Sequence, residues 1–374
     1  MKYKLGEICE IISGSTPKTG IPEYWDGTQK WITPAELNED TYIITDSIRK
    51  LTELGVEKAG LSSFPEGTVI LSSRAPIGKV AIAGCEMYCN QGFKNLICSE
   101  KINNHYLYWF LKGRTEYLNS LGRGATFKEI SKQIVSNIEI DVPPIEQQKQ
   151  AVNQLEKANA IIQLRKQQLQ KLDELVKARF VEMFGDPMIN PKDFPCYTVG
   201  EVIDFQGGSQ PDKKYFEYES SPDNIRLIQI RDYKSDKYIT YIPRSMAKRF
   251  CTVDDIMIGR YGPPIFQILK GIEGSFNVAL MKATPKIGNR EFIRQFLKQD
   301  CLLEYLEGLS KRTAGQDGIQ MDKLKAYPFP YPPIELQEQF AAFVEQTDKS
   351  KSVVQKALDE AQLLFDSLMQ QYFG

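Results

Sequence analysis

Histidine is nearly absent from this sequence, with a single copy, His105, among 374 residues. A catalytic triad based on histidine would have to use this one residue, and a metal site with several histidines is excluded. Seven cysteines occur without a repeated spacing, so we expect reduced thiols rather than a disulfide framework. No apolar run reaches the roughly 20 residues of a membrane span, and the first residues lack the layout of a signal peptide. These absences predict a cytoplasmic protein without membrane contact.

Motifs for nucleotide or metal chemistry are also missing. No GxGxxG follows an expected strand, and neither GxxxxGK[ST] nor a base-methylation motif of the Asn-Pro-Pro-Tyr type occurs. Cys85, Cys89, Cys98 and His105 match no zinc-finger spacing, and the second half has no cysteines at the matching places. The sequence has 48 acidic residues, but nothing groups them into a hydrolase site. We therefore expect no catalysis, metal or cofactor in this chain.

No part of the chain is strongly basic. Basic and acidic residues number 16 and 17 in residues 1–143, 7 and 5 in 144–185, 21 and 19 in 186–332, and 3 and 7 in 333–374. A protein that holds DNA mainly by bulk phosphate attraction would be strongly basic. Any nucleic-acid surface must therefore be local.

The sequence contains an internal repeat. Residues 4–7 (KLGE) match residues 198–201 (TVGE), and residues 14–17 (GSTP) match residues 208–211 (GSQP), both displaced by 194 positions. Further along the displacement is 189, and it matches three pairs of segments: Arg123 with Arg312, Pro143–Glu146 with Pro332–Glu335, and Phe184–Gly185 with Phe373–Gly374. Repeats of this kind indicate one structural unit written twice.

Between these anchors the two copies share little beyond spacing, with faint echoes such as Leu71–Arg74 against Met257–Arg260. A duplicated scaffold with divergent content favours two sites that read different things. The alternative is drift after duplication in a protein with one active half. Short runs at 68–72, 80–83, 95–98, 225–230 and 255–258 predict strands, and residues 105–120 and 290–309 predict helices. We expect a mixed α+β domain in each copy.

Two long helices are expected at residues 144–185 and 333–374. Each opens at a Pro-Pro pair, has no glycine or proline in residues 145–184 or 334–373, and stops at glycine. Apolar residues recur at seven-residue spacing, as in a coiled-coil seam: Leu155, Ile162, Leu169, Val176 and Met183, and Val344, Leu358, Phe365 and Tyr372. At 1.5 Å per residue each helix is about 60 Å long. An antiparallel pair with a pseudo-two-fold axis would bury both stripes; the alternatives are packing on the helix's own domain or on another chain.

Loops of the first copy carry candidate DNA contacts. The first loop has hydroxyls and a cation that suit contact with phosphate. Arg74 follows an expected strand, and the amide side chains at 90–91 can hydrogen-bond to the edge of adenine. The candidates are Ser15, Thr16, Lys18, Arg74, Lys79, Asn90, Gln91, Lys94, Arg123, Thr126 and Lys128. The alternatives are an ordinary surface turn, an arginine paired with a carboxylate inside the domain, and a capped turn around Asn90.

Loops of the second copy supply a parallel set. Arg260 follows a strand beside glycine and proline, and Arg312 repeats Arg123 within a loop, where packing explains repetition poorly. The candidates are Gln210, Lys213, Lys214, Arg231, Arg260, Tyr261, Asn277, Arg312, Thr313 and Gln316.

Both helix entrances carry a family pattern. The sequence reads PPIEQQK at residues 143–149 and PPIELQEQ at 332–339, with GSTP near the start and FGDP after the first helix. This layout resembles the specificity subunit of type I restriction-modification systems over essentially the whole chain. Gln210 departs from the pattern, because the first copy has Thr16 there, which leaves open whether the two loops make the same backbone contact.

The resemblance implies two target recognition domains, 1–143 and 186–332, each reading one half of a bipartite, asymmetric duplex DNA sequence. The helices 144–185 and 333–374 would be the spacer that fixes the gap. Partners would be two modification subunits carrying S-adenosylmethionine and, optionally, two restriction subunits using ATP and magnesium. The alternative is a non-DNA coiled-coil scaffold that binds partner proteins or peptides, and the weak basic patches are its best support.

Overall fold

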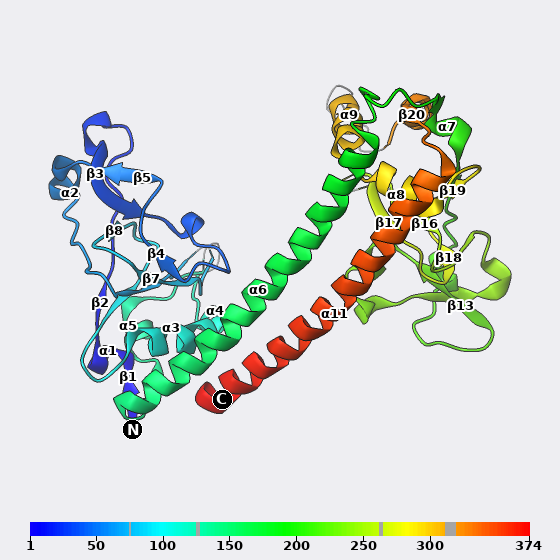
Figure 1. Cartoon of the computed structure of the whole chain (residues 1–374). Coiled ribbons are helices and arrows are strands. Elements are labelled where there is room, and N and C mark those ends of the chain that lie inside the picture. The colour runs from blue at the N-terminus through cyan, green and yellow to red at the C-terminus, as the bar shows by residue number, and fades with distance from the viewer. Residues whose placement is uncertain (75, 125–127, 262–264, 311–318) are drawn as a thin grey trace. The chain divides into compact units, whose positions relative to one another are not determined.

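The computed structural model describes residues 1–74, 76–124, 128–261, 265–310 and 319–374. They form two compact units, residues 1–166 with 356–374 and residues 167–355. Each unit holds one globular domain, the start of one long helix and the end of the other (Figure 1). We call the globular parts domain 1, from β1 to β10, and domain 2, from β11 to β20.

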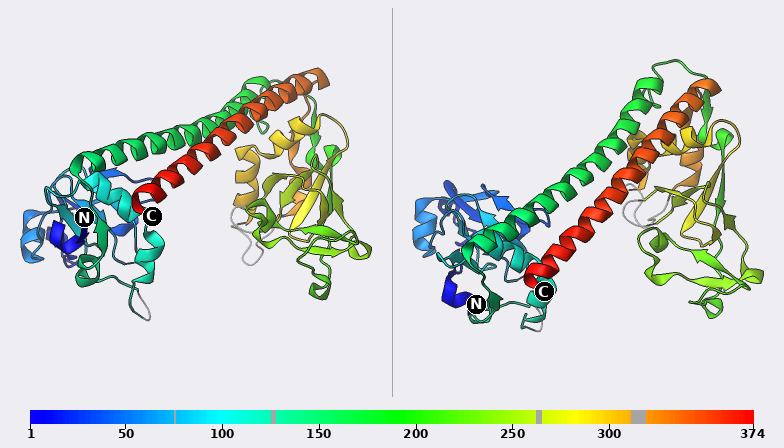
Figure 2. Two further views of the ribbon diagram at one scale, coloured as in Figure 1. Left: turned by 90° about the horizontal axis from the view of Figure 1, so that it is seen from below. Right: turned by 60° about the horizontal axis from the view of Figure 1, so that its bottom comes forward.

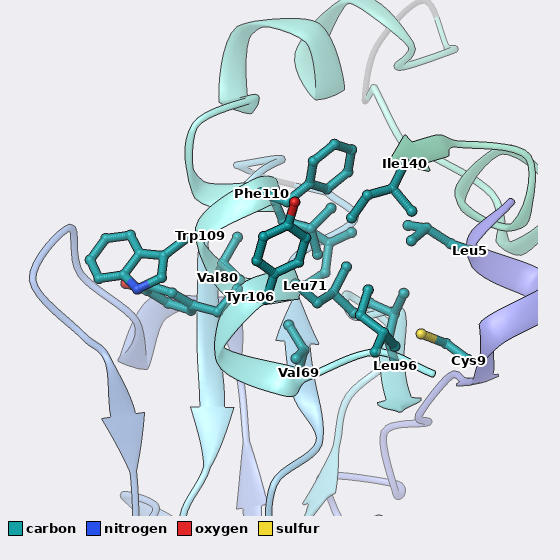
Figure 3. Packing of buried hydrophobic residues seen from close by; sticks show 14 of the residues in the cluster. Leu5, Cys9, Val69, Leu71, Val80, Leu96, Tyr106, Trp109, Phe110 and Ile140 are labelled. Atoms are coloured by element: carbon teal, nitrogen blue, oxygen red, sulfur yellow. The ribbon is translucent and has the colours of Figure 1, made fainter. Parts of the chain in front are cut away.

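The core of domain 1 is a five-stranded sheet in the order β2-β9-β6-β7-β4. The strands are β2 (Cys9–Ile12), β9 (Asn95–Cys98), β6 (Val69–Leu71), β7 (Val80–Ala83) and β4 (Ile43–Ile44). Helix α3 (Asn104–Lys112) covers the sheet, and Figure 3 shows Tyr106 and Phe110 beside Val69 and Leu71. Six consecutive residues of α3 are buried, because other elements pack around this helix on every side.

A second, smaller sheet is ordered β5-β3-β8; β3 and β5 come between β2 and β6 in the chain, and β8 comes between β7 and β9. It consists of β5 (Arg49–Leu51), β3 (Trp25–Ile32) and β8 (Tyr88–Cys89), with the short helices η1 (Pro22–Tyr24), η2 (Pro34–Glu36) and α2 (Glu53–Lys58) nearby in sequence. Trp25, Trp31 and Leu51 form its own small core. The remaining elements of domain 1 are β1 (Lys2–Lys4), α1 (Leu5–Ile8), α4 (Thr115–Ser120), α5 (Lys132–Ser136) and β10 (Glu139–Asp141).

Domain 2 has a main sheet in the order β12-β19-β16-β17 and a smaller one in the order β14-β13-β18-β15. The strands are β11 (Cys196–Thr198), β12 (Ile203–Gly207), β13 (Asn224–Ile228), β14 (Tyr241–Pro243), β15 (Phe250–Cys251), β16 (Ile256–Gly259), β17 (Gln267–Lys270), β18 (Gly274–Phe276), β19 (Leu280–Pro285) and β20 (Pro328–Pro330). The helices are α7 (Val199–Val202), α8 (Arg290–Leu297), α9 (Asp300–Ser310) and α10 (Met321–Ala326), with η3 (Lys213–Tyr215), η4 (Ile230–Tyr233), η5 (Asp236–Tyr238) and η6 (Arg244–Met246).

The two domains share one topology despite their divergent sequences. The main sheets match strand for strand over β2-β9-β6-β7 and β12-β19-β16-β17, and β1-β10 matches β11-β20. In the smaller sheets β3 pairs antiparallel with β5 and parallel with β8, as β13 does with β14 and β18. The expected α+β repeat is therefore confirmed at the level of strand pairing.

The strand registers also correct one expected match between the copies. Val69 pairs with Leu96 and Ser72 with Phe93, while Ile256 pairs with Ala283 and Gly259 with Leu280. Ser73 is therefore the counterpart of Arg260, and Arg74 lies one residue further along. Both arginines follow the ends of their strands, and they are one position apart when the strand pairings are aligned.

The two helices expected before the repeated arginines are each broken in two. Residues 105–120 form α3 and α4, separated at Gly113 and Arg114, and residues 290–309 form α8 and α9, separated at Lys298 and Gln299. Gly113 is the C-cap of α3, and its N–H donates to the carbonyls of Trp109 and Leu111. A break lets the second helix turn, so both can pack on the domain.

The long helices are α6 (Ile145–Phe184) and α11 (Ile334–Phe373), and within each unit they run antiparallel (Figures 1 and 2). In the first unit the Tyr372 hydroxyl donates to Gln154 Oε1 at 2.8 Å. In the second unit Lys351 pairs with Asp173 at 2.6 Å, and the rings of Phe180 and Phe340 are 5.5 Å apart. The expected antiparallel arrangement is confirmed within each unit.

The seven-residue stripe lies largely in the domain cores. Leu155 is buried in the core of domain 1, and Val176 and Val344 are buried in the core of domain 2. Phe365 and Tyr372 pack on the first core and Met183 on the second. Ile162 is buried, and Leu169 and Leu358 are half-buried. Leu155 and Val344 thus pack on the helix's own domain, as the alternative to a helix–helix seam expected, whereas Val176, Met183, Phe365 and Tyr372 pack on the other domain.

The repeated Phe-Gly at the helix ends has a packing explanation. Phe184, at the end of α6, lies 4.8 Å from Phe292 of α8, between ring centroids. Phe373, at the end of α11, lies 4.9 Å from Tyr106 of α3. Each helix thus begins at the domain that precedes it in sequence and ends on the other domain.

The repeated glutamine after Pro-Pro fastens each helix to its own domain. Gln148 is fully buried; its Oε1 accepts the N–H of Asn103, and its Nε2 donates to the carbonyls of Lys101 and Pro143. Gln337, also fully buried, accepts the N–H of Asn289 and donates to the carbonyl of Pro332. Asn103 and Asn289 are the N-caps of α3 and α8. The family pattern at the helix entrances is therefore a structural fastening.

Candidate nucleic-acid interface

In domain 1 the first candidate loop, residues 13–20, is held by backbone and tryptophan contacts. The N–H of Ser15 donates to the carbonyl of Cys89 at 3.1 Å. The indole N–H of Trp31 donates to the carbonyl of Ser15 at 3.1 Å, and that of Trp25 donates to the carbonyl of Lys18 at 3.3 Å. These contacts fix the backbone while the side chains of Thr16 and Lys18 stay exposed.

Glycine is required at the start of this loop in both domains. A Cβ on Gly14 would lie 1.8 Å from the carbonyl oxygen of Cys89, and one on Gly208 would lie 1.9 Å from that of Asn277. The N–H of Ser209 donates to the carbonyl of Phe276 at 3.1 Å, which matches the contact of Ser15. The substitution of Gln210 for threonine therefore leaves the backbone contact of the loop unchanged.

The loop after β8 has the same conformation as the loop after β18. The backbone N–H of Asn90 donates to the carbonyl of Ile32, and the backbone N–H of Asn277 donates to the carbonyl of Ile228. The side chain of Asn90 accepts the N–H of Gly92 at 2.9 Å, and the side chain of Asn277 accepts the N–H of Ala279 at 3.1 Å. The capped-turn alternative therefore describes both asparagines, whose side-chain oxygens are used within the loop.

The structure joins two of the predicted loops in domain 1. The Thr16 hydroxyl donates to Gln91 Oε1, and both side chains are exposed. In domain 2 the residues at the same two backbone positions are Gln210 and Val278, which are also exposed. The Gln210 side-chain amide donates to the carbonyl of Pro211 at 3.2 Å.

Glu129 contacts three of the predicted basic residues of domain 1: the side chains of Lys94 and Arg74, and the backbone of Arg123. Lys94 Nζ lies 3.1 Å from Glu129 Oε1, and Arg74 lies 3.7 Å from Oε2. The backbones of Arg123 and Glu129 exchange two hydrogen bonds of 3.0 Å, while the Arg123 side chain is exposed. Arg74 therefore pairs with a carboxylate inside its domain, which was the alternative to a DNA contact. The guanidinium stays accessible, because the distance is long and the side chain is one-third exposed.

Two predicted DNA contacts are corrected by their surroundings. Lys94 is 7 % exposed, and its ammonium also donates to Ser73 Oγ. The Lys79 ammonium donates to the carbonyls of Pro34 and Leu37. Lys94 is buried and Lys79 is half-buried, and both ammonium groups bond protein oxygens that hold loops together, because a polar group removed from water needs a partner in the protein. Lys128 is exposed, and Thr126 lies outside the described residues.

The basic candidates of domain 2 surround the smaller sheet and the end of β16. Arg260 donates to the carbonyl of Val278 at 3.5 Å, and its guanidinium lies 5.4 Å from the ring centre of the exposed Tyr261. Arg231 donates to Thr240 Oγ1 at 3.0 Å. Lys213 is exposed, and Lys214 pairs with Asp212 at 3.6 Å. Arg312, Thr313 and Gln316 lie outside the described residues.

A buried carboxylate organises the base of the Arg231 loop. Asp232 accepts the N–H of Gln229 at 3.2 Å and lies 3.6 Å from Arg226. Burial raises the pKa of Asp232 above its ordinary value, and the hydrogen bond from Gln229 and the charges of Arg226 and Arg231 act against this rise. The counterpart in domain 1 is Glu36, which accepts the N–H of Thr33 at 2.7 Å.

Several residues that shape these loops are absent from the sequence-based candidates. Trp25 and Trp31 anchor the first loop, and Glu36 and Asp232 cap the helical turns after β3 and β13. Two tryptophans within seven residues of a largely polar segment were the available signal.

Among the described residues, no three histidine, cysteine, aspartate or glutamate side chains are grouped so that they could hold a metal ion. Within the same residues, no helix is long and apolar enough to cross a bilayer.

The sequence belongs to the family described as the type I restriction modification DNA specificity domain, which matches residues 1–174 and 191–362. The type I restriction enzyme MjaIX specificity subunit of Methanocaldococcus jannaschii is 33 % identical over 271 residues, and the match covers 63 % of each chain. The MjaVIII specificity subunit of the same organism is 23 % identical over 392 residues, covering 95 % of this chain and 89 % of that one.

Solved structures share the fold. The S subunit of a type I restriction-modification system from M. genitalium has a TM-score of 0.58 at 14 % identity and covers 100 % of this chain and 96 % of its own. A chain from a study of complex assembly and conformational transition of the type I R-M system has a TM-score of 0.57 at 18 % identity, covering 100 % and 97 %. The two-copy architecture is thus that of known S subunits.

Proposed function

We propose that this chain is the DNA-recognition subunit of a type I restriction-modification complex, with each domain reading one half of a bipartite, asymmetric duplex target. The observation that carries the proposal is the combination of one backbone topology with two different sets of exposed loop side chains. Two similar scaffolds with different loop chemistry suit two different half-sites. The relatives, which are specificity subunits of type I restriction enzymes, support the same conclusion.

The chain would select the sequence and perform no chemistry. Methylation of adenine would be done by two modification subunits that bind S-adenosylmethionine, and cleavage by optional restriction subunits that use ATP and magnesium. The complex would act in the cytoplasm, on cellular or incoming DNA. Near-neutral charge fits this division, because partner subunits can supply much of the phosphate contact.

The long helices would fix the gap between the half-sites and dock the modification subunits. Apolar side chains that stay exposed on them support docking: Ile161, Leu164, Leu175 and Val181 on α6, and Val353, Leu363 and Leu364 on α11. Exposed apolar residues at this density on a helix surface are typical of protein interaction sites.

Exchange of one domain tests the proposal. Residues 1–143 are replaced by the corresponding segment of a relative, with the residues that contact Phe365 and Phe373 retained so that the end of α11 still packs. Methylome sequencing of cells carrying the chimera should show one changed half-site. Replacement of residues 186–332 is the matched experiment and should change the other half. An unchanged motif, or a change in both halves, would contradict the proposal.

Insertion of seven residues into both helices is a second test. Equal insertions after residues 166 and 355, where the two units meet in sequence, keep the antiparallel pairing within each unit. The gap in the methylated motif should lengthen while both half-sites stay the same. An unchanged gap would rule out the helices as the spacer.

A further inference from the structure

We propose that the meeting point of two loops in each domain carries a glutamine that reads one A·T base pair of its half-site, Gln91 in domain 1 and Gln210 in domain 2. We call this meeting point the loop junction: residues 14–18 with 89–92, and residues 208–212 with 276–279. The inference rests on the proposed function, and it assigns specificity to a particular side chain of each domain.

The backbone of the loop junction is the same in both domains. Hydrogen bonds from Ser15 to Cys89 and from Ser209 to Phe276 join the two loops. The second loop is tied to the main sheet by bonds from Ser73 to Gly92 and from Arg260 to Ala279. Thr16 therefore occupies the position of Gln210, and Gln91 occupies the position of Val278.

The glutamine comes from opposite loops in the two domains. In domain 1 the first loop has threonine and the second has glutamine; in domain 2 the first loop has glutamine and the second has valine. At these two positions each domain thus presents one carboxamide, although the rest of the loops has diverged. Duplication alone would leave the glutamine in the same loop, so its presence in either loop points to a requirement for the group itself.

Folding does not explain these glutamines. Gln91 and Gln210 are exposed, and the side-chain contacts that they make are to an exposed threonine and to the neighbouring proline carbonyl. A hydrogen bond between groups open to water contributes little to stability, because water replaces it. A buried glutamine of this chain, such as Gln148, behaves differently and bonds three backbone groups.

The carboxamide matches the major-groove edge of adenine. Its oxygen accepts the adenine N6 hydrogen while its nitrogen donates to N7, a bidentate contact that other bases do not offer. The hydroxyl of Thr16 uses one lone pair of Gln91 Oε1, so the second lone pair and both amide hydrogens remain for the base. The bond from Gln210 to Pro211 uses one amide hydrogen and leaves the other hydrogen and the oxygen.

Thr16 is a positioning residue in this scheme. The backbone around Thr16 is fixed by the Trp31 and Trp25 indoles, so its hydroxyl holds Gln91 Oε1 in a defined direction. Orienting the amide before binding lowers the conformational entropy lost on contact with the base. Removal of the hydroxyl should weaken the preference for adenine without changing which base is preferred.

The experiment uses the full chain in complex with its modification subunits and selects bound duplexes from a library with randomised half-sites. Gln91→Ala should lower the preference for A·T at one position of one half-site by about tenfold to a hundredfold. Gln210→Ala should do the same in the other half-site, and Thr16→Val should give a smaller loss at the Gln91 position. Gln133→Ala, an exposed glutamine on α5, is the matched control and should change nothing.

Two results would overturn the inference: unchanged base preferences in Gln91→Ala, or an equal loss in both half-sites. Thermal unfolding of each variant should match wild type, since the substituted side chains are exposed. Wild-type complex that selects no bipartite sequence would refute the proposed function together with this inference. Wild-type selection with an unaffected Gln91→Ala variant would refute this inference alone.

Discussion

The two domains are alike in strand pairing and unlike in how their loops are held. Domain 1 fixes its first loop with two tryptophan indoles, whereas the described residues of domain 2 contain no tryptophan, because all three lie in residues 1–143. In domain 2 the same backbone is held by the N–H groups of Gly208 and Ser209, which donate to the carbonyls of Leu280 and Phe276. The fold of this loop thus needs only the backbone hydrogen bonds, and the tryptophan contacts occur in domain 1.

The smaller sheets differ in charge as well. Residues 21–67 of domain 1 contain 4 basic and 9 acidic side chains, while the matching residues 211–254 of domain 2 contain 9 and 7. The chain as a whole has a net charge near zero, but residues 21–67 are acidic and residues 211–254 are mildly basic. We expect domain 2 to depend more on phosphate contact and domain 1 more on its ordered loops.

The largest difference between the two halves should come from the helix ends. Phe184 is 4 % exposed and touches Phe180, Phe292 and Phe340, so Phe184→Ala should cost about 3–5 kcal/mol in the second unit. Phe373 is half-buried, so Phe373→Ala should cost the first unit less. Hydrogen exchange of α8 and α3 measures the two units separately, and equal losses would contradict the contrast.

The glutamine fastening offers a comparison within one helix turn. Gln148→Ala leaves the Asn103 N–H and two carbonyls without partners and should cost about 2–3 kcal/mol. Gln337→Ala should cost somewhat less, because fewer bonds are lost. Gln147→Ala, at the exposed neighbouring position, should be within about 0.5 kcal/mol of wild type in denaturant unfolding. A cost at Gln147 equal to that at Gln148 would show that helix propensity, not the fastening, is measured.

The tryptophan contacts of the first loop allow a test that affects domain 1 and not domain 2. Trp31→Phe removes the indole donor to Ser15 and should cost about 1 kcal/mol of stability in domain 1. Binding to a duplex with only the domain 1 half-site should weaken severalfold, and binding to the other half-site should not change. In the wild type, intrinsic tryptophan fluorescence should respond to the first duplex and not to the second. A response to both would mean that the domains are coupled.

The smallest effect is expected in salt dependence. Each phosphate contact adds a slope of about 0.9 to the plot of log binding constant against log salt concentration. The double variant Lys213→Gln with Lys214→Gln should lower this slope by up to twice that amount for the domain 2 half-site. Lys18→Gln should lower it by a single contact for domain 1. Slopes that do not change would place these lysines away from the DNA.

The repeat and the long helices were predictable because they depend on local rules. Pro-Pro entrances, glycine ends and seven-residue spacing are readable in one sequence, and the predicted fold class is confirmed. The break between α3 and α4 has a signal in Gly113, but the break between α8 and α9, at Lys298 and Gln299, contains no glycine or proline and was not predictable from the apolar pattern. The register shift between Arg74 and Arg260 also depends on strand pairing, which a faint sequence match cannot fix.

The candidate contacts were predictable only to the level of the loop. Residue type predicted Lys79 and Lys94 as cations near DNA, but their ammonium groups contact Leu37 and Glu129, which are distant in sequence. The contact between Thr16 and Gln91 spans 75 positions and has no sequence signal. The DNA contacts as a set stay predictions.

The placement of each helix end has a consequence for the order of folding. Tyr106 of domain 1 packs on Phe373, so the first unit stays incomplete while the ribosome makes the next 267 residues. During that interval the surface of α3 around Trp109 and Tyr106 is exposed to water or to chaperones. Closing so long a loop costs entropy and slows folding. We therefore expect the newly made chain to pass through a stage in which residues 167–355 are folded while the first unit is still open.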